Sequence, residues 1–241
     1  MVSAARHSET EYRHELKYRI SRGSYEILRG RLKAAMRSDP NAENGRYRIT
    51  SLYFDDPYRS AYYDKQNGIL NRKKFRIRTY NLDPAFIRLE EKCKNGDMGY
   101  KKNAVLNLGE YRALLSGKTD FLSEKRFSGT AAEDFLWATA ANRLAPAVVV
   151  DYLREPYICA AGNVRVTFDL RISAGNTRDL FDPNTRFTPA LPNDEAVLEI
   201  KYDRFLPLYI EELLSGVPLL YESVSKFVLC SDTARFLQYG C

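Results

Sequence analysis

Charged and apolar residues alternate along several short stretches of this chain, and two of these stretches follow one another between Arg72 and Lys102. The first carries Lys74, Arg76 and Arg78 at alternate positions, and the second carries Arg88, Glu90, Lys92 and Lys94. Successive side chains of a strand point to opposite sides, so the pattern predicts two strands that each have a charged face and a largely apolar face. A half-exposed antiparallel strand alternates in the same way, so the interpretation depends on recurrence.

The pattern does recur, and it is interrupted by segments with a helical period. Further strands are predicted at 12–20, 47–54, 147–154, 164–172 and 196–203, and helices at 21–36, 57–67, 108–115, 130–144, 207–214 and near the C-terminus. Ser21 or Ser24 is predicted to cap the first helix. Trp137 is predicted to lie in the core with its helix neighbours Phe135 and Leu136. Residues 1–10 are expected to be a disordered lead and 11–241 a single domain, since no repeat or linker is visible.

The charged faces of these strands are mostly positive. They carry thirteen cations against four acids: Arg13, Lys17, Arg19, Lys74, Arg76, Arg78, Arg88, Lys92, Lys94, Arg154, Arg165, Arg171 and Lys201 against Glu15, Glu90, Asp169 and Glu199. The whole chain is nearly balanced, with 37 Lys and Arg against 31 Asp and Glu, so these faces are enriched in cations. The pattern favours an α+β fold in which a closed antiparallel sheet has a wet, basic lumen and helices pack on its apolar outside. Independently solvated strand faces are the alternative.

Composition excludes several classes of protein. The four cysteines form no Cys-x-x-Cys pair and the only histidines are His7 and His14, so a zinc site is not expected. The N-terminus lacks the apolar stretch that is typical of a signal peptide. The longest strongly apolar run, Ala145–Val150, is too short to span a bilayer. We therefore expect a cytoplasmic protein with reduced thiols, which would need a membrane-bound partner chain to work at a membrane.

A lumen lined by Lys and Arg suits a chain of phosphates, because Arg offers a bidentate fork and Lys a point charge. A carboxylate kept among these cations could hold a divalent metal, and Glu199 is the best placed. A salt bridge from Glu199 to Lys201 or Arg165 is the alternative. No phosphate-binding glycine loop is present. A Ser-His-Asp site is not expected, because His7 lies in the tail and His14 is predicted to be a packed core residue.

Seven short motifs occur in an order that resembles one family. They are Glu15-Leu16-Lys17-Tyr18, Arg76-Ile77-Arg78, Leu89-Glu90-Glu91-Lys92, Asp151-Tyr152-Leu153-Arg154, Val164-Arg165-Val166-Thr167-Phe168-Asp169, Leu198-Glu199-Ile200-Lys201 and Ser225-Lys226-Phe227. Together they resemble the VTC catalytic domain, the polyphosphate polymerase member of the CYTH-like triphosphate tunnel metalloenzyme superfamily. The resemblance covers the chain from Tyr12 to Leu229. It implies an eight-stranded antiparallel β-barrel tunnel with a basic lumen and helices outside.

The resemblance also implies an activity, transfer of the γ-phosphate of ATP onto a growing inorganic polyphosphate chain with release of ADP. Catalytic roles would fall to Lys17, Arg76, Arg78, Lys92, Arg154 and Lys226, substrate contacts to Glu15, Lys101, Tyr152, Arg165, Lys201 and Ser225, and binding of Mn²⁺ or Mg²⁺ to Glu199. The chain departs from the family at Asn103, where an Arg is favoured, which affects one end of the tunnel. The regulatory and membrane segments of eukaryotic relatives are also not seen in this sequence, which affects coupling to transport.

Other functions stay open at this point. A tunnel triphosphatase differs only in using water as the acceptor, and hydrolysing relatives usually begin Glu-x-Glu-x-Lys, whereas this chain has Arg13-His14-Glu15-Leu16-Lys17. A non-catalytic polyphosphate- or nucleotide-binding module would keep the cations and could dispense with Glu199. A nucleic-acid binder is not expected, because exposed stacking aromatics interleaved with the cations are not evident.

Overall fold

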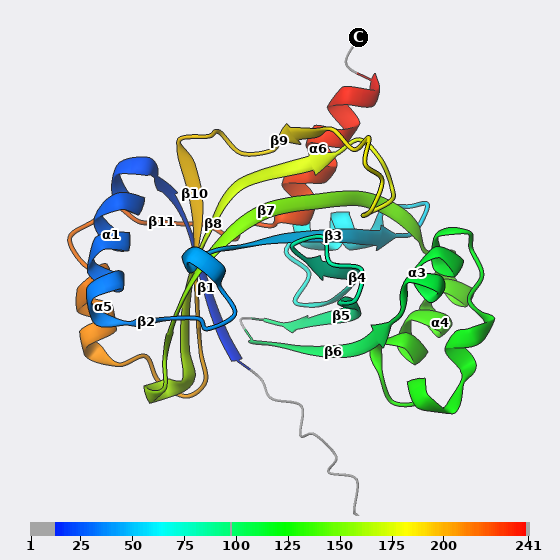
Figure 1. Cartoon of the computed structure of the whole chain (residues 1–241), viewed down its shortest axis with the longest axis horizontal. Helices are drawn as coiled ribbons and strands as arrows, with labels where there is room; N and C mark the ends of the chain where they lie inside the picture. Colours follow the sequence, from blue (N-terminus) through cyan, green and yellow to red (C-terminus); the bar gives the residue numbers. More distant parts are fainter. Residues whose placement is uncertain (1–12, 97, 240–241) are drawn as a thin grey trace, which may run out of the picture.

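The computed structural model describes residues 13–96 and 98–239, so the predicted disordered lead lies outside the described residues. Eight antiparallel strands close into a barrel (Figure 1) in the order β7, β3, β4, β5, β6, β1, β10, β8 and back to β7. Their bounds are β1 Arg13–Ser21, β3 Tyr47–Asp55, β4 Asn71–Tyr80, β5 Ile87–Asn95, β6 Met98–Leu106, β7 Ala145–Cys159, β8 Val164–Gly175 and β10 Glu195–Tyr202. The predicted closed antiparallel eight-stranded barrel is therefore confirmed.

Six helices and several short elements accompany the barrel in the described residues. The helices are α1 Arg22–Ala35, α2 Ser60–Gln66, α3 Leu108–Leu115, α4 Ala131–Asn142, α5 Leu208–Leu214 and α6 Lys226–Tyr239. Short strands β2 Arg37–Ser38, β9 Phe187–Pro189 and β11 Leu220–Tyr221 extend the sheet, and 3₁₀ turns cover Glu43–Gly45, Asp120–Ser123, Lys125–Phe127 and Ala161–Asn163. Ser21 caps α1 by accepting from the Ser24 amide, and Asn107 and Glu110 form a capping box at α3. These caps satisfy backbone donors that a helix start leaves free.

The register of the barrel places charged residues opposite one another on the inner face. Lys17 of β1 pairs with Glu199 of β10, and Arg76 of β4 pairs with Glu90 of β5. Residues directly opposite in an antiparallel pair have neighbouring side chains. The charged faces predicted from the sequence therefore meet inside one barrel.

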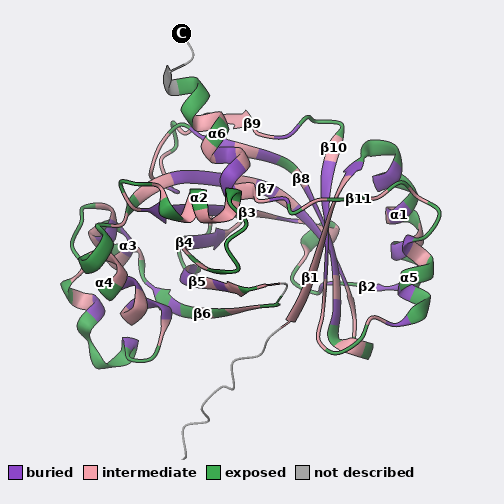
Figure 2. Ribbon diagram, turned by 180° about the vertical axis from the view of Figure 1, so that it is seen from behind, coloured by how far each residue is buried: buried purple, intermediate pink, exposed green. Residues whose placement is uncertain are grey.

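Apolar side chains of the outer face hold the helices against the barrel. Leu28 of α1 packs with Leu198 of β10 in one cluster, and Phe135 of α4 packs with Ile77 of β4 in another. Figure 2 shows buried residues on the strands and on the helix sides that face them, with exposed residues on the outer helix sides. Burial of these apolar surfaces is the main force that fixes the helices outside. No helix of the described residues is long and apolar enough to cross a membrane.

Helix α6 begins at one end of the barrel instead of lying wholly against its side. Phe227 in its first turn stacks on Tyr53 of β3 at 5.0 Å between ring centroids, and it belongs to a cluster with Val150 and Tyr152 of β7. Tyr53 and Tyr152 also line the lumen. The start of α6 therefore narrows the barrel at this end.

Three predicted placements are wrong. Trp137 is 68% exposed, because it lies two positions from the buried Phe135 and so projects from the opposite side of α4. Arg171 is exposed and has a φ of 54°, at a bulge where two residues of β8 oppose one of β7, so the alternation slips and Arg171 leaves the inner face. His14 is half-buried, stacks on Tyr202 at 4.8 Å and lines a cavity, so it is not a core residue.

Candidate functional site

Two cavities occupy the lumen and share part of their walls. The cavity at the α6 end has a volume of about 150 Å³, and the cavity at the other end has about 750 Å³. We call them the narrow and the wide cavity. Both are lined by Glu15, Arg76, Arg78, Lys92, Arg154, Glu199 and Lys201. The shared walls make the two cavities adjoining parts of one lumen.

All thirteen residues that the sequence predicts for the site line this lumen. Besides the seven that are shared, the narrow cavity has Lys17, Tyr152, Ser225 and Lys226, and the wide cavity has Lys101 and Arg165. Of the thirteen cations predicted on the charged faces, ten line a cavity. The other three are Arg171, Arg19, which pairs with Glu195, and Arg88, which lies over the ring of Phe86.

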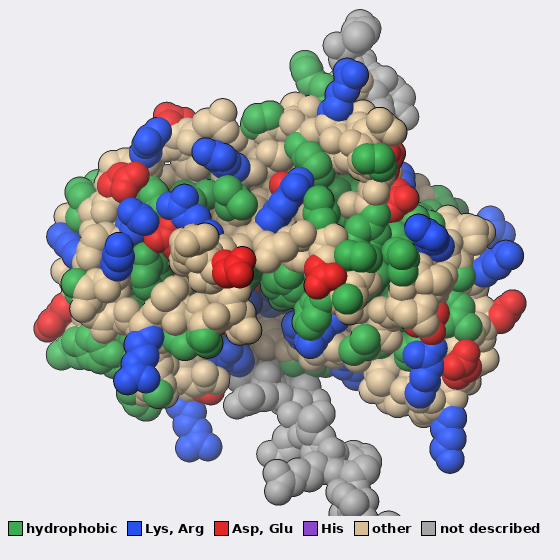
Figure 3. Space-filling model, viewed as in Figure 1, with side chains coloured by type: hydrophobic (Ala, Val, Ile, Leu, Met, Phe, Trp, Pro, Cys, Tyr) green, Lys and Arg blue, Asp and Glu red, His purple; other side chains and the backbone are tan. Residues whose placement is uncertain are grey.

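Positive charge is concentrated inside the barrel. The wall of the narrow cavity has eleven Lys and Arg against three Glu, and that of the wide cavity has nine against two. On the outer face shown in Figure 3, Lys and Arg are interspersed with acidic and apolar side chains and form no single patch. The lumen is therefore the part of the described chain that is best suited to an extended anion.

Glu90 of β5 holds the guanidinium of Arg76 in place. Its Oε2 accepts from Arg76 Nε at 2.7 Å and lies 2.6 Å from Nη2, while its Oε1 accepts from Lys101 Nζ at 2.8 Å. Burial raises the pKa of the Glu90 carboxyl, but Arg78, Arg76 and Lys101 lower it by more, and the net pKa is well below the ordinary value. Glu90 is thus a buried carboxylate that orients two cations toward the lumen.

Asp169 of β8 holds Arg154 and Lys226 in place, as Glu90 holds Arg76 and Lys101. It accepts from Arg154 Nε and Nη2 at 2.7 Å each, and Lys226 Nζ lies 2.5 Å from Oδ2. Asp169 is fully buried, and its pKa is raised by burial but lowered overall by the two cations. A bidentate pair of this kind fixes the guanidinium plane. Arg154 and Lys226 come from β7 and α6, so this carboxylate also ties the end of the barrel to the helix.

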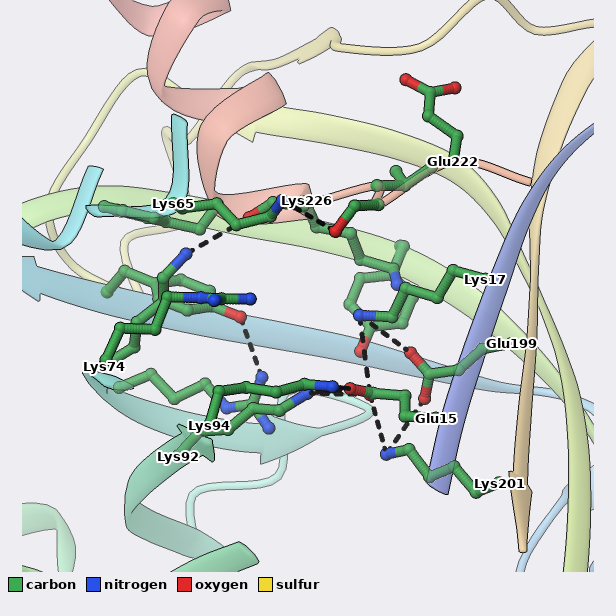
Figure 4. A pocket seen from close by; sticks show the side chains of 18 of the residues that line it. Glu15, Lys17, Lys65, Lys74, Lys92, Lys94, Glu199, Lys201, Glu222 and Lys226 are labelled. Carbon is green, nitrogen blue, oxygen red and sulfur yellow. Dashed lines mark hydrogen bonds and ion pairs between the residues drawn. The ribbon is translucent and has the colours of Figure 1, made fainter. Parts of the chain in front are cut away.

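Glu15 of β1 lies among four lysines. Its oxygens are 2.8 Å and 3.0 Å from Lys92 Nζ, 3.5 Å from Lys17 and Lys201, and 3.4 Å from Lys94 (Figure 4). Burial raises the pKa of Glu15, but these lysines lower it well below its ordinary value. Glu15 acts as an internal counter-ion for lysines that would otherwise repel one another.

Arg78 differs from Arg76 and Arg154 because no carboxylate lies close to it. Its Nη1 is 3.6 Å from Glu90, its Nε donates to Ser51 at 3.3 Å and its Nη2 to Tyr152 at 3.5 Å. Only 6% of Arg78 is exposed. A buried guanidinium with such long contacts is available to a phosphate that enters the lumen.

Glu199 of β10 forms the ion pair with Lys201 that the sequence left as the alternative to a metal site. Lys201 Nζ lies 3.0 Å from its Oε1, whereas Lys17 and Arg154 lie farther away, at 3.7 Å each. Burial raises the pKa of Glu199, but Lys201, Lys17 and Arg154 lower it overall, well below its ordinary value. No group of three or more candidate metal-ligating residues occurs among the described residues. Mg²⁺ is often bound by one or two carboxylates together with substrate phosphates and water, so a single carboxylate such as Glu199 could be its protein ligand.

Some lumen residues were missed in the sequence-based site assignment. Glu90 and Asp169 were recognised on the charged faces but given no role, and Arg72 continues the alternation of β4 one step before Lys74. The alternation of β3 places Tyr53 on the inner face, but this strand was not compared with the charged strands. Lys65 and Ser223 lie outside the strands of the barrel, and no local signal places them at the lumen.

Comparison with known proteins agrees with this geometry. Residues 12–234 match the VTC domain. A structure from Hippeastrum, of a candidate adenylyl cyclase with a dominant triphosphatase activity, has a TM-score of 0.55 and 13% identity over 92% of this chain and 96% of that chain. A candidate adenylate cyclase from Vibrio parahaemolyticus has a TM-score of 0.52 and 14% identity over 92% and 99%. At these identities the two structures show a shared fold. No curated protein matches the chain significantly.

Proposed function

The chain belongs to the VTC domain family, and we propose that it is a metal-dependent polyphosphate polymerase. In this reaction a terminal oxygen of an inorganic polyphosphate chain attacks the γ-phosphorus of ATP. The bond from that phosphorus to the β,γ-bridging oxygen breaks, ADP leaves, and the chain grows by one phosphate. The family and the tunnel fold support the broader class, an enzyme that handles triphosphates in a tunnel.

The observation that carries the proposal is the extent of the cationic lumen. Lys and Arg line both adjoining cavities, from Lys101 and Arg165 in the wide one to Lys17 and Lys226 in the narrow one. A single triphosphate would occupy only part of such a lumen. A nucleotide and a phosphate chain that meet inside it would use the whole length.

Four cationic residues of the proposed site have roles that their contacts support. Arg76, Arg154 and Lys226 are oriented by buried carboxylates, so they would bind phosphate oxygens with little reorganisation. Arg78 would bind the transferring phosphoryl group, because its guanidinium is not engaged by a close carboxylate. Phosphoryl transfer depends mainly on positioning and on stabilising charge, which these side chains supply.

The tunnel metalloenzyme family generally uses divalent metals, and we propose that Glu199 holds Mn²⁺ or Mg²⁺ in this chain. A metal bound there would neutralise charge on the phosphates of the nucleotide. Glu15 is less suitable, since four lysines within 3.5 Å disfavour a further cation.

Two observations favour transfer to phosphate over hydrolysis. Hydrolysis needs a group that orients or activates water, yet Glu15, Glu90 and Asp169 are each engaged by two or more cations, and Glu199 is assigned to the metal. Arg13, at the position of the first Glu of hydrolysing relatives, pairs with Asp203 at 2.6 Å. A cation at this place cannot act as a general base for water.

The proposal is tested by incubating the purified protein with ATP and either Mn²⁺ or Mg²⁺ and resolving the products. We expect ADP and polyphosphate to accumulate together at matching rates. Free phosphate in place of polyphosphate would identify a triphosphatase, and binding of polyphosphate without any product would identify a non-catalytic module.

Polyphosphate binding is expected to depend strongly on salt. Several cations would be neutralised together, so raising the salt concentration from about 50 to about 200 mM should weaken binding at least about tenfold. Titration of polyphosphate into the metal-free protein at several salt concentrations measures this. Binding that does not change with salt would contradict a cationic lumen as the binding surface.

We further propose that residues 11–241 act as one domain in the cytoplasm, where ATP is available, and that a membrane-bound partner chain recruits it when it works at a membrane. Cys93, Cys159 and Cys230 are free thiols, which suits a reducing compartment. Fractionation of cells that express the protein tests the location, and recovery of the protein outside the cytoplasm would contradict it.

A further inference from the structure

Three cations at the α6 end of the narrow cavity form a group that we call the mouth cluster: Lys65 from α2, and Arg72 and Lys74 from β4. They face the segment that joins β11 to α6. Lys65 Nζ donates to Ser223 Oγ at 2.9 Å and Lys74 Nζ to Ser225 Oγ at 3.4 Å. Figure 4 shows Lys65 and Lys74 extending into the cavity from the side opposite Lys17 and Glu199. Cations and hydroxyl donors thus converge on one place.

None of the three cations of the mouth cluster forms an ion pair among the described residues. Two acids, Asp55 near Lys74 and Glu222 near Lys65, act on them only from a longer distance. Deeper in the lumen the situation differs, since each inner carboxylate engages at least two cations. The positive charges of Lys17, Lys65 and Arg72 act on Lys74, and the charge of Asp55 opposes them. The Lys74 amine lies 4.7 Å from the centroid of the Phe227 ring. Uncompensated positive charge that is partly buried is costly unless an anion is bound.

The pKa of Lys74 follows from these surroundings. Burial and, after it, the charges of Lys17, Arg72 and Lys65 lower the pKa of its amine to about 7. The pKa of Lys65 is lowered for the same reasons, by burial and by neighbouring cations. An anion at this place would restore the charge of both lysines.

The size of the narrow cavity limits what the anion can be. At about 150 Å³ it is smaller than the roughly 300–1,000 Å³ of pockets that enclose drug-sized ligands, whereas the wide cavity, at about 750 Å³, is within that range. A nucleoside therefore fits the wide cavity better. A bare phosphate chain, which is slender and carries charge at every unit, fits the narrow one.

We propose that the mouth cluster, with Ser223 and Ser225, is a separate subsite that binds inorganic polyphosphate beyond the reacting phosphates. This inference rests on the proposed function, because it assumes that a phosphate chain occupies the lumen. It assigns the two ends of the tunnel different ligands, with nucleotide at the wide end and inorganic chain at the narrow end. Chain length then becomes part of recognition, since only a long chain reaches the mouth cluster.

The test compares a short and a long ligand on one variant. In Lys65→Met/Lys74→Met we expect affinity for long polyphosphate to fall at least about tenfold, because two charge-assisted contacts are lost. Affinity for tripolyphosphate should change by less than about twofold. The matched control is Lys118→Met/Lys125→Met, which removes the same charge from two exposed lysines outside the lumen, and it should bind both ligands as the unaltered protein does.

The outcomes separate this inference from the proposed function. An equal loss for both ligands would place the two lysines in the reacting site, and no loss for either would show that the mouth binds no chain. A loss confined to ATP would show that the narrow end binds the nucleoside. Each of these results overturns the subsite and leaves the polymerase assignment standing. Failure of the unaltered protein to bind polyphosphate of any length would overturn both.

A second test uses pH. Between about pH 7 and pH 9 the free protein loses the proton of Lys74, but a bound chain raises the pKa of this amine and retains the proton. Binding therefore takes up a proton, and affinity for long polyphosphate should fall as pH rises, by up to about tenfold per unit. Each internal phosphate of a long chain has one strongly acidic group, which is ionised throughout this range. Lys74→Arg, which stays charged, should remove most of the slope, and an unchanged slope would contradict the role of Lys74.

Discussion

Arg78→Ala is expected to reduce the rate of polyphosphate synthesis about a hundredfold while the barrel still folds. Arg78 is only 6% exposed, and its guanidinium has long contacts to Ser51, Tyr152 and Glu90 and a hydrogen bond with Tyr80, but no short ion pair. Its removal therefore costs little structure, since Glu90 keeps Arg76 and Lys101 at 2.6–2.8 Å. A charge-assisted contact to a phosphoryl group contributes about 1.5–3 kcal/mol, and more if it tightens in the transition state. At 1.36 kcal/mol per tenfold, that gives a factor of about a hundred.

The measurement is ADP release from ATP in the presence of polyphosphate, together with the melting temperature of the variant. Arg88→Ala is the matched control, because Arg88 lies directly across from Arg78 on β5 but lines neither cavity. It should retain activity. Near-normal turnover of Arg78→Ala would remove the Arg76-Ile77-Arg78 strand from the proposed site.

Arg76→Ala is a less clean test of the same strand. Arg76 is the closest partner of Glu90, which is 1% exposed, so its removal leaves a buried carboxylate with one short ion pair fewer. Loss of one partner from a buried pair is destabilising, so a drop in activity would be mixed with a drop in stability. Arg78→Ala avoids this loss of stability, because Arg78 forms no short ion pair. The two arginines differ in this respect only because the fold gives them different partners.

Glu199→Gln is expected to separate metal-dependent chemistry from binding. The substitution keeps the shape of the side chain but removes the charge that a hard cation prefers. Loss of metal stabilisation worth several kcal/mol would reduce turnover by about a hundredfold or more and raise the Mn²⁺ concentration needed for half-maximal activity. The lumen gains one net positive charge, so polyphosphate should bind to the metal-free variant as well as before, or more tightly.

Glu15→Gln is the control for Glu199→Gln, because the two carboxylates share Lys17 and Lys201 as ion-pair partners. If Glu199 served only as a counter-ion, both variants would lower the melting temperature and leave the Mn²⁺ titration unchanged. Our proposal expects the titration to shift in Glu199→Gln alone. Normal turnover of Glu199→Gln at the usual Mn²⁺ concentration would show that the proposed mechanism is wrong at its centre.

The sequence by itself determined the barrel and most of its inner wall. Alternation has a period of two residues and depends only on strand geometry, so the shared face of Lys74, Arg76 and Arg78 could be predicted from β4 alone. That this face points inward was predicted from the recurrence of the pattern in other strands. The cap of α1 at Ser21 could also be predicted, because a cap forms within one turn of the helix. The order of the motifs then identified the family.

Local pattern was insufficient where the strand was irregular or the helix face ambiguous. The bulge in β8 moved Arg171 out of the lumen, since one extra residue shifts every later side chain to the other face. Trp137 is large and apolar, yet the side of α4 that faces the barrel is set by Phe135 and its neighbours. Hydrophobicity alone does not determine which of two helix faces packs against the barrel.

Only the tertiary structure decided how the charges are paired. Lys226 reaches Asp169 across 57 positions of sequence, and Lys65 reaches Ser223 across 158, because closure of the barrel and the return of α6 bring these segments to one mouth. Charge interactions depend on distance and burial, which sequence-distant strands set jointly. The composition of the lumen was therefore predictable from the sequence. The fold alone decides that carboxylates hold most cations deep in the lumen, whereas the described residues form no ion pair with the mouth cluster.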